Sequence, residues 1–368
     1  MEHDQFVLPR RKFVKSLAIA SAGLTAGLSV PGQNAAAALK NIELGIDNFA
    51  VRAMGWKAPA LIDYAASLRT DSLLISDLDA FDNFEEKYLQ DLKSKAADQG
   101  LQIYDGSWSI CPTSRTFRNK WGTAEEHLAL GIRVAKAVGS PVIRVVLGSG
   151  EDRKTEGGIA ARIKDTVKVC KALRSQALDA GVKIAVENHA GDMQTWELVT
   201  LIEEAGKEYV GANMDSGNAT WTMEEQLASL EVLGPYAVCT SLRDSAVWES
   251  VNGATIQWTA MGDGNTDLKA YFQRYAELCS KVPVHIETIS GFNREIPYLK
   301  DDFWKTWPQA KAKDFARFLA LAKTGKPRDP YKTPEGKDRT LADQEYQKAE
   351  IEKSIKYCKE ALGLGLKS

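Results

Sequence analysis

The sequence has little histidine, and its cysteines show no metal-binding spacing. Four histidines occur in 368 residues, and His3 lies near the N-terminus, so His127, His189 and His285 are left for chemistry. The five cysteines include no CxxC pair, and their odd number and scatter are typical of buried thiols in a large domain. A zinc site built on cysteine and histidine is therefore not expected, and any metal site must rely mainly on carboxylates.

The sequence also lacks an excess of either charge and a glycine-rich nucleotide fingerprint. Its 47 basic and 49 acidic residues leave a formal net charge of −2, which gives no support for a nucleic-acid partner. No GxGxxG motif follows the first apolar run, which disfavours a doubly wound dinucleotide fold. The hydrophobic content of 44% is enough for one large core. These features favour one large domain.

Residues 1–38 have the pattern of an export signal. A basic cluster, RRKFVK, begins at Arg10, an uncharged stretch runs from Ser16 to Val30, and Ala35–Ala38 offers small residues for a signal peptidase. The stretch is short and weakly apolar for a membrane span, and no cysteine follows it for a lipid anchor. We therefore predict a twin-arginine signal peptide over 1–38, a location in the periplasm and no stable membrane anchor.

From residue 41 the sequence alternates short apolar runs with amphipathic stretches of helical period. The runs are Ile42–Ile46, Ser72–Ile75, Ile103–Trp108, Val142–Leu147, Val182–Val186, Val210–Met214, Ala237–Leu242 and Val284–Ile289. Eight strand–helix repeats are typical of a closed parallel barrel, so we predict a single (β/α)8 TIM barrel, an α/β fold, over residues 41–325. The last barrel helix is expected near Ala310–Ala322.

Residues 326–368 differ from the barrel in composition. They are strongly charged, and a helix is predicted over Leu341–Leu362. The segment contains no recognisable chemistry. We expect this helical C-terminal extension to pack either on the outside of the barrel or on a second subunit of a homo-oligomer.

Acidic residues end three of the later strands, where a barrel of this kind has its active site. Glu187 ends the fifth apolar run, Asp215 the sixth, and Glu287 stands in the eighth. Their carboxylates should converge at the mouth, where a divalent cation relieves their mutual repulsion. Such a cation can polarise a sugar carbonyl while a carboxylate moves a proton on the neighbouring carbon. The pattern therefore predicts an isomerase, an epimerase or a lyase.

The segments VENHAG, NMDSGN, SLRDS, MGDGNTD and HIETISG, in this order, resemble the second half of the sugar phosphate isomerase/epimerase family, whose barrel is xylose isomerase-like. The resemblance covers residues 41–325. It implies one divalent metal ion (Mn, Co, Mg or Zn) held by Glu187, Asp215 and Glu287, and it implies that Glu187 and Glu287 act as acid and base on opposite faces of the substrate. The sequence departs from the family at Ser241, where a ligand histidine is expected.

A serine hydroxyl is a poor metal ligand, so the metal is held more weakly, or another residue replaces the histidine, or the metal has been lost. His189, on the same side of its strand as Glu187, and Gln257 are the candidate replacements. The predicted substrate-binding residues lie at neighbouring strand ends and are Trp108, Arg144, His189, Asn218 and Arg243.

Several of these residues also have a structural interpretation. Glu187 and Glu287 could pair with Arg144 or Arg243 in a structural network, and His285 could be a core residue. His127 is predicted to lie on the exposed face of a helix. Trp196, Trp221 and Trp258 follow strand ends together with Trp108, which fits an aromatic wall for stacking a sugar.

These residues support three functional hypotheses. The first is a metal-dependent isomerase or epimerase that acts on a non-phosphorylated sugar or sugar derivative, because phosphorylated sugars are cytoplasmic. The second is a 3-keto-glycoside lyase that uses the same site for elimination. The third, from another class, is a non-catalytic periplasmic sugar-binding protein. An endonuclease of a related barrel is disfavoured, because its metal cluster needs several histidines.

Overall fold

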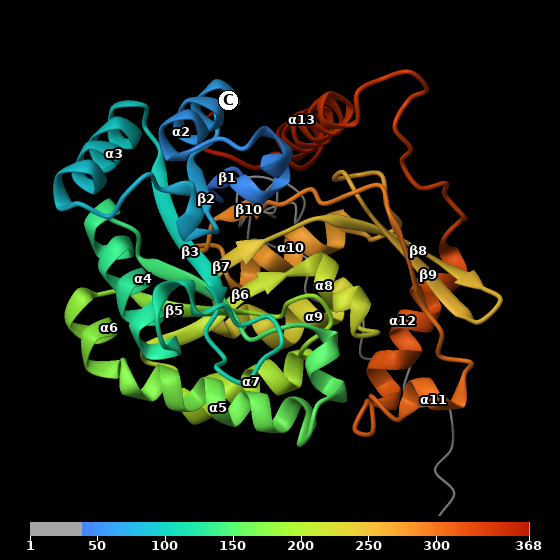
Figure 1. The fold of residues 1–368 in the computed structure, drawn as a ribbon. Helices are drawn as coiled ribbons and strands as arrows, with labels where there is room; N and C mark the ends of the chain where they lie inside the picture. Colours follow the sequence, from blue (N-terminus) through green and yellow to red (C-terminus); the bar gives the residue numbers. More distant parts are fainter. Residues whose placement is uncertain (1–38, 368) are drawn as a thin grey trace, which may run out of the picture.

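The computed structural model describes residues 39–367, so the predicted signal peptide lies outside the described residues. Eight parallel strands form a ring in the order β10-β1-β2-β3-β4-β5-β6-β7, and the ring closes where Leu242 bridges Ile286 (Figure 1). The barrel strands are β1 (Leu44–Asp47), β2 (Ser72–Ile75), β3 (Gln102–Ser109), β4 (Val142–Val146), β5 (Lys183–Glu187), β6 (Val210–Asp215), β7 (Ala237–Ser241) and β10 (Val284–Ile286). The predicted TIM barrel is confirmed.

The strands and helices form because their apolar residues match the layers of a barrel. A strand of a barrel is covered on both faces, so it reads as a continuous apolar run; all positions of β4 are buried, including Arg144. The helices outside the ring are α2 (Ala58–Ser67), α3 (Glu86–Asp98), α4 (Ala124–Val138), α5 (Gly158–Ala172), α6 (Arg174–Ala180), α7 (Thr195–Ala205), α8 (Ser216–Trp221), α9 (Gln226–Leu233) and α10 (Leu268–Leu278). None of the helices in the described part of the chain has the length and apolarity to cross a bilayer.

A second, antiparallel sheet extends from the strand ends and was not predicted. Its strands are β8 (Asp244–Ser250), β9 (Gly253–Thr259) and β11 (Asn293–Ile296), and α11 (Asp301–Trp304) and α12 (Ala312–Thr324) lie beside it (Figure 1). Phe318 of α12 packs with Val247 and Ile256 in a core separate from that of the barrel. The expectation that Ala310–Ala322 is the last barrel helix is therefore wrong, because α12 covers the smaller sheet instead.

The C-terminal extension supplies the missing barrel helix. It contains α13 (Arg339–Tyr357) and a π-helical turn, η6 (Cys358–Leu362), so the helix predicted over Leu341–Leu362 is present. Ile351 and Ile355 of α13 join the barrel core, and α13 packs against β10 and the 3-10 helix η1 (Asn48–Met54) that follows β1 (Figure 1). On the face opposite the mouth, the Gly365 amide donates to the Ile42 carbonyl at 2.9 Å. The extension therefore packs on the outside of its own barrel.

His127 is buried on α4, so the prediction that it is exposed is wrong. Its Nε2 hydrogen-bonds to the Ser107 hydroxyl, and its Nδ1 has no partner in the described part of the chain. Burial lowers the pKa of His127 to about 4, because the imidazolium would lose its hydration there.

This lowered pKa predicts a loss of stability in acid. Between about pH 6.5 and about pH 4, His127 binds a proton in the unfolded chain but not in the folded chain. The contribution of His127 to the free energy of unfolding therefore falls as the pH drops from about 6.5 to about 4. We expect His127→Asn to reduce the loss of unfolding free energy between pH 7 and pH 4.5 by about 2 kcal/mol. Urea unfolding at both pH values measures it. An unchanged difference in the variant would contradict the assignment.

Candidate active site

Residues at or near the C-terminal ends of several barrel strands line one cavity at the mouth. The cavity has a volume of about 240 Å³. Seven predicted site residues line it: Trp108, Arg144, Glu187, His189, Asn218, Arg243 and Glu287. The eighth, Asp215, is fully buried and contacts Arg243. The structure therefore brings the predicted residues together, while their catalytic and ligand roles stay predictions.

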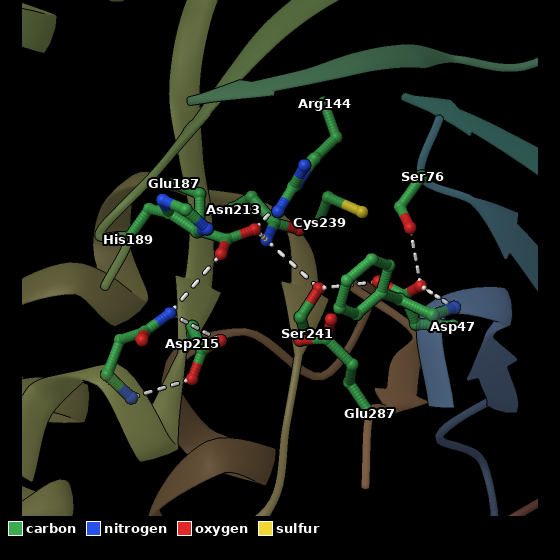
Figure 2. Close-up of polar contacts among 12 residues, drawn as sticks. Asp47, Ser76, Arg144, Glu187, His189, Asn213, Asp215, Cys239, Ser241 and Glu287 are labelled. Atoms are coloured by element: carbon green, nitrogen blue, oxygen red, sulfur yellow. Dashed lines mark hydrogen bonds and ion pairs between the residues drawn. The ribbon is translucent and has the colours of Figure 1, made fainter. Parts of the chain in front are cut away.

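Glu187, at the end of β5, is held by donors on both of its carboxylate oxygens (Figure 2). Arg144 Nε donates to Oε2 at 2.6 Å and Asn213 Nδ2 donates to the same oxygen at 2.7 Å. Asn218 Nδ2 reaches Oε1 at 3.3 Å. Burial alone would raise the pKa of Glu187, but the Arg144 guanidinium outweighs it and the pKa is lowered. The side chain is therefore a carboxylate at neutral pH.

Arg243 lies between two other carboxylates on the floor of the cavity. Its Nη2 contacts both Asp215 and Glu287, and its side chain is only 1% exposed. Its Nε and Nη1 have no partner among residues 39–367. A Cβ at Gly217 would lie 2.5 Å from the Arg243 Cδ, so the glycine makes the room in which the long side chain lies.

The two carboxyls that contact Arg243 have raised pKa values. Burial raises the pKa of Asp215 to about 7 and that of Glu287 well above its usual value, and Arg243 opposes both shifts. Both carboxyls contact the same guanidinium, so protonation of one leaves more of its charge to compensate the other. Of the two, only Glu287 lines the cavity. It is therefore the carboxyl that can exchange a proton with a ligand.

Asp47, at the end of β1, belongs to the site but was not predicted. It accepts from the Ser76 hydroxyl at 2.6 Å and from the Ser241 hydroxyl at 3.2 Å (Figure 2). The sequence does contain a signal for Asp47, because this acidic residue directly follows the apolar run Ile42–Ile46. Glu187 follows the fifth apolar run in the same way. Asp47 itself does not line the cavity, and the lining residues that were not predicted are Phe49, Ser76, Asp77, Ala190, Ile289 and Phe292. They lie in loops after strands, where the sequence gives no distinct signal.

Trp221 and Trp258 line the cavity as part of a layered stack. Their rings are parallel within 11° at 4.1 Å between centroids. The Arg294 guanidinium lies 3.7 Å from the Trp221 centroid, and that of Arg243 lies 4.3 Å from the Trp258 centroid. Each tryptophan therefore has the other ring on one face and a guanidinium on the opposite face. The order of the groups along the stack is Arg294, Trp221, Trp258 and Arg243.

This stack corrects the expected aromatic wall. Both faces of Trp221 and Trp258 are covered, so these two rings are not free to stack on a sugar. Trp196 does not line the cavity, and it borders a separate hollow that Trp307 also lines. Only Trp108, of the four predicted tryptophans, keeps that role as a prediction.

His285 and His189 differ in their surroundings. His285 is fully buried between the Ser72 hydroxyl and the Thr240 carbonyl, which makes it a core residue. His189 lines the cavity, and its Nδ1 lies 2.6 Å from the Gly148 carbonyl. A carbonyl only accepts, so Nδ1 carries a proton and Nε2 of the neutral ring is an acceptor.

The model of the xylose isomerase-like TIM barrel family matches residues 62–301. The chain belongs to this family. No curated protein matches it. Among solved structures, a D-psicose 3-epimerase with D-tagatose from Clostridium cellulolyticum H10 is 14% identical with a TM-score of 0.53, and the match covers 85% of this chain and 98% of that chain.

Two further solved structures have the same fold. An L-ribulose 3-epimerase is 14% identical with a TM-score of 0.52, covering 88% of this chain and 97% of that chain. The IolI protein with a bound zinc atom is 15% identical with a TM-score of 0.52, covering 77% of this chain and 100% of that chain. At these identities the likeness shows the xylose isomerase-like fold alone.

The family resemblance implies a metal ion held by Glu187, Asp215 and Glu287. The side chains of these residues do not fit a metal ion in this arrangement. Asp215 and Glu287 contact the guanidinium, Glu187 is held by three donors, and the Ser241 hydroxyl donates to Asp47. A dication beside a buried guanidinium would be strongly repelled. Between residues 39 and 367, no group of three or more His, Cys, Asp or Glu side chains is placed to hold a metal ion.

Of the two candidate replacements for the histidine ligand, only His189 lines the cavity. The side chain of Gln257 donates to the Asn293 side chain at 2.8 Å and to the Asp329 carbonyl at 3.0 Å. Gln257 therefore ties the C-terminal extension to the smaller sheet and does not reach the carboxylates.

Proposed function

We propose that this protein is an enzyme that moves a proton on the carbon next to the carbonyl of a non-phosphorylated sugar, as an isomerase or epimerase. The observation that carries the proposal is the pair Glu187 and Glu287, which line one cavity from β5 and β10 in different environments. Charged and neutral donors hold Glu187 as a carboxylate, while Glu287 shares one guanidinium with Asp215. Two carboxyl groups whose different surroundings give them different pKa values are typical of an acid–base pair.

In the proposed reaction, Glu187 removes the proton from the carbon beside the carbonyl. The electron pair of that C–H bond moves to the carbonyl oxygen and gives an enediolate. Glu287 then delivers its proton to carbon, which leaves Glu187 protonated and Glu287 ionised. Glu187 afterwards releases its proton to solvent water and Glu287 takes one from solvent water, which restores the site. Delivery to the opposite face of the same carbon, with the electron pair returning from oxygen to restore the carbonyl, gives the epimer. Delivery to the former carbonyl carbon, with the proton of the adjacent hydroxyl passing to the former carbonyl oxygen, gives the isomer.

The size and charge of the cavity support a single uncharged sugar as the substrate. A volume of about 240 Å³ is below the range of roughly 300–1,000 Å³ for drug-sized ligands. Both guanidiniums that line the cavity contact carboxylates, so the lining carries no excess positive charge for the dianion of a phosphate. The predicted export of the chain to the periplasm points the same way. Two solved structures of similar fold are those of sugar 3-epimerases.

The test is deuterium exchange at the substrate carbon, followed by NMR in D₂O. The full chain is incubated with free ketoses and aldoses and with 3-keto sugars and 3-keto-glycosides. We expect deuterium to enter next to the carbonyl while the carbon skeleton is kept. The matched control is Glu208→Gln, on the surface, which should exchange like the parent.

Other results would replace the proposal. Release of an alcohol from a 3-keto-glycoside would identify the lyase reaction. Binding of a sugar with neither exchange nor release, across the whole panel, would identify a non-catalytic sugar-binding protein.

A further inference from the structure

The cavity contains a permanent cation of its own at the point where the carboxylates meet. We propose that the Arg243 guanidinium takes the place of a divalent metal ion: it binds the carbonyl oxygen of the substrate and stabilises the enediolate, so the reaction needs no metal. This inference rests on the proposed function for the reaction, but its statement about metal binding can be tested without any substrate.

The unpartnered nitrogens of Arg243 indicate where a ligand oxygen binds. Only Nη2 contacts Asp215 and Glu287, while Nε and Nη1 have no acceptor in the described part of the chain. A buried donor without an acceptor is destabilising, so such donors are normally satisfied by a ligand or water. Because Arg243 lines the cavity, a substrate oxygen can supply the missing acceptor.

The chemical class of the ligand follows from the geometry of a guanidinium. Its fixed, planar fork of donors suits two oxygens side by side better than a point charge does. A carbonyl and the hydroxyl on the next carbon present such a pair. Unlike a carboxyl group, arginine keeps its proton, so Arg243 stabilises the enediolate by hydrogen bonds and charge. The proton transfers to and from carbon are made by the two glutamates alone.

The fold fixes the position of this guanidinium from three sides. Gly217 has no Cβ to fill the space of the Arg243 stem, and the Trp258 ring lies 4.3 Å from the guanidinium carbon. Trp258 is itself held, because its Nε1 donates to the Gly217 carbonyl at 2.9 Å. The Arg243 amide donates to the Ser216 hydroxyl at 3.0 Å. A donor set held in place in this way is the arrangement that stabilises developing negative charge.

Metal content tests the inference directly. The full chain is treated with EDTA, incubated separately with MnCl₂ and ZnCl₂, desalted and analysed for metal. We expect far less than about one equivalent in the parent and a gain toward about one equivalent in Arg243→Ala, because that change frees the carboxylates of Glu187, Asp215 and Glu287 for a cation. Arg274→Ala, which removes a surface arginine paired with Glu231, is the matched control and should stay without metal.

The overturning result is about one equivalent of either metal in the parent that is lost in Glu287→Gln. Thermal melting monitored by circular dichroism checks that each variant is folded. If Arg243→Ala does not fold, Arg243→Lys keeps the positive charge without the fork, and we expect it to stay without metal and to lose about 10²-fold in exchange rate.

The two proposals can fail separately. If no sugar exchanges, the proposed function fails, and the metal content of the parent and of Arg243→Ala still decides whether the guanidinium excludes a cation. If sugars exchange only after metal is added, the proposed function holds and this inference is overturned. EDTA-treated parent that exchanges at the full rate supports both.

Discussion

Glu187→Gln is expected to lower the rate of deuterium exchange by about 10³-fold, while the affinity for the sugar changes by only a few fold. The amide keeps the size of the side chain and can still accept from Arg144, but it cannot take a proton from carbon. Exchange is measured by NMR in D₂O, and affinity is measured by calorimetry with the same sugar.

The control for this prediction is Glu208→Gln, which changes a half-exposed carboxylate far from the cavity. If Glu187→Gln lost affinity and exchange rate in equal measure, Glu187 would be a substrate-binding residue and another group would be the base. If neither changed, the acid–base pair proposed for the cavity would be wrong.

The largest effect on stability should come from Arg144→Leu. Arg144 and Glu187 are 4% and 1% exposed, and their ion pair spans 2.6 Å. Removing one partner of a buried pair leaves a charge without compensation, which costs about 3–5 kcal/mol of unfolding free energy. Urea unfolding at pH 7 measures the loss, and the double variant Arg144→Leu, Glu187→Leu should recover most of it.

A surface ion pair of the same chemistry supplies the comparison. Arg174 and Glu208 are 51% and 49% exposed at 3.0 Å, so Arg174→Leu should cost less than about 1 kcal/mol. Equal losses in the two single variants would show that the carboxylate of Glu187 does not depend on Arg144 for its charge.

The eight barrel strands could be predicted because each is buried on both faces and reads as an unbroken apolar run. The smaller sheet was missed although part of its signal was present. The turn between β8 and β9 is Val251-Asn252, and the Asn-Gly pair at 252–253 is a typical signal of a hairpin. The pairing of β9 with β11 joins segments far apart in the sequence, so local pattern carries no information about it.

The residues of the site could be predicted from the sequence, but the contacts among them could not. Strand ends converge in any barrel of this kind, so Glu187, Asp215 and Glu287 could be placed together from sequence alone. The position of Arg243 between two of them depends on Gly217 and Trp258, which lie on other elements. An arginine at a strand end reads the same whether it binds a substrate, pairs with a carboxylate or occupies the place of a cation.

The contact between Gly365 and Ile42 has a practical consequence for engineering. The two ends of the folded body lie side by side, and the Lys367 ammonium reaches the carbonyls of Thr70 and Gly100 just ahead of β2 and β3. Both ends of the described residues therefore lie at the end of the barrel opposite the mouth. A short peptide could join them in a circularly permuted chain, and a reporter domain fused at either place would leave the path of the substrate clear.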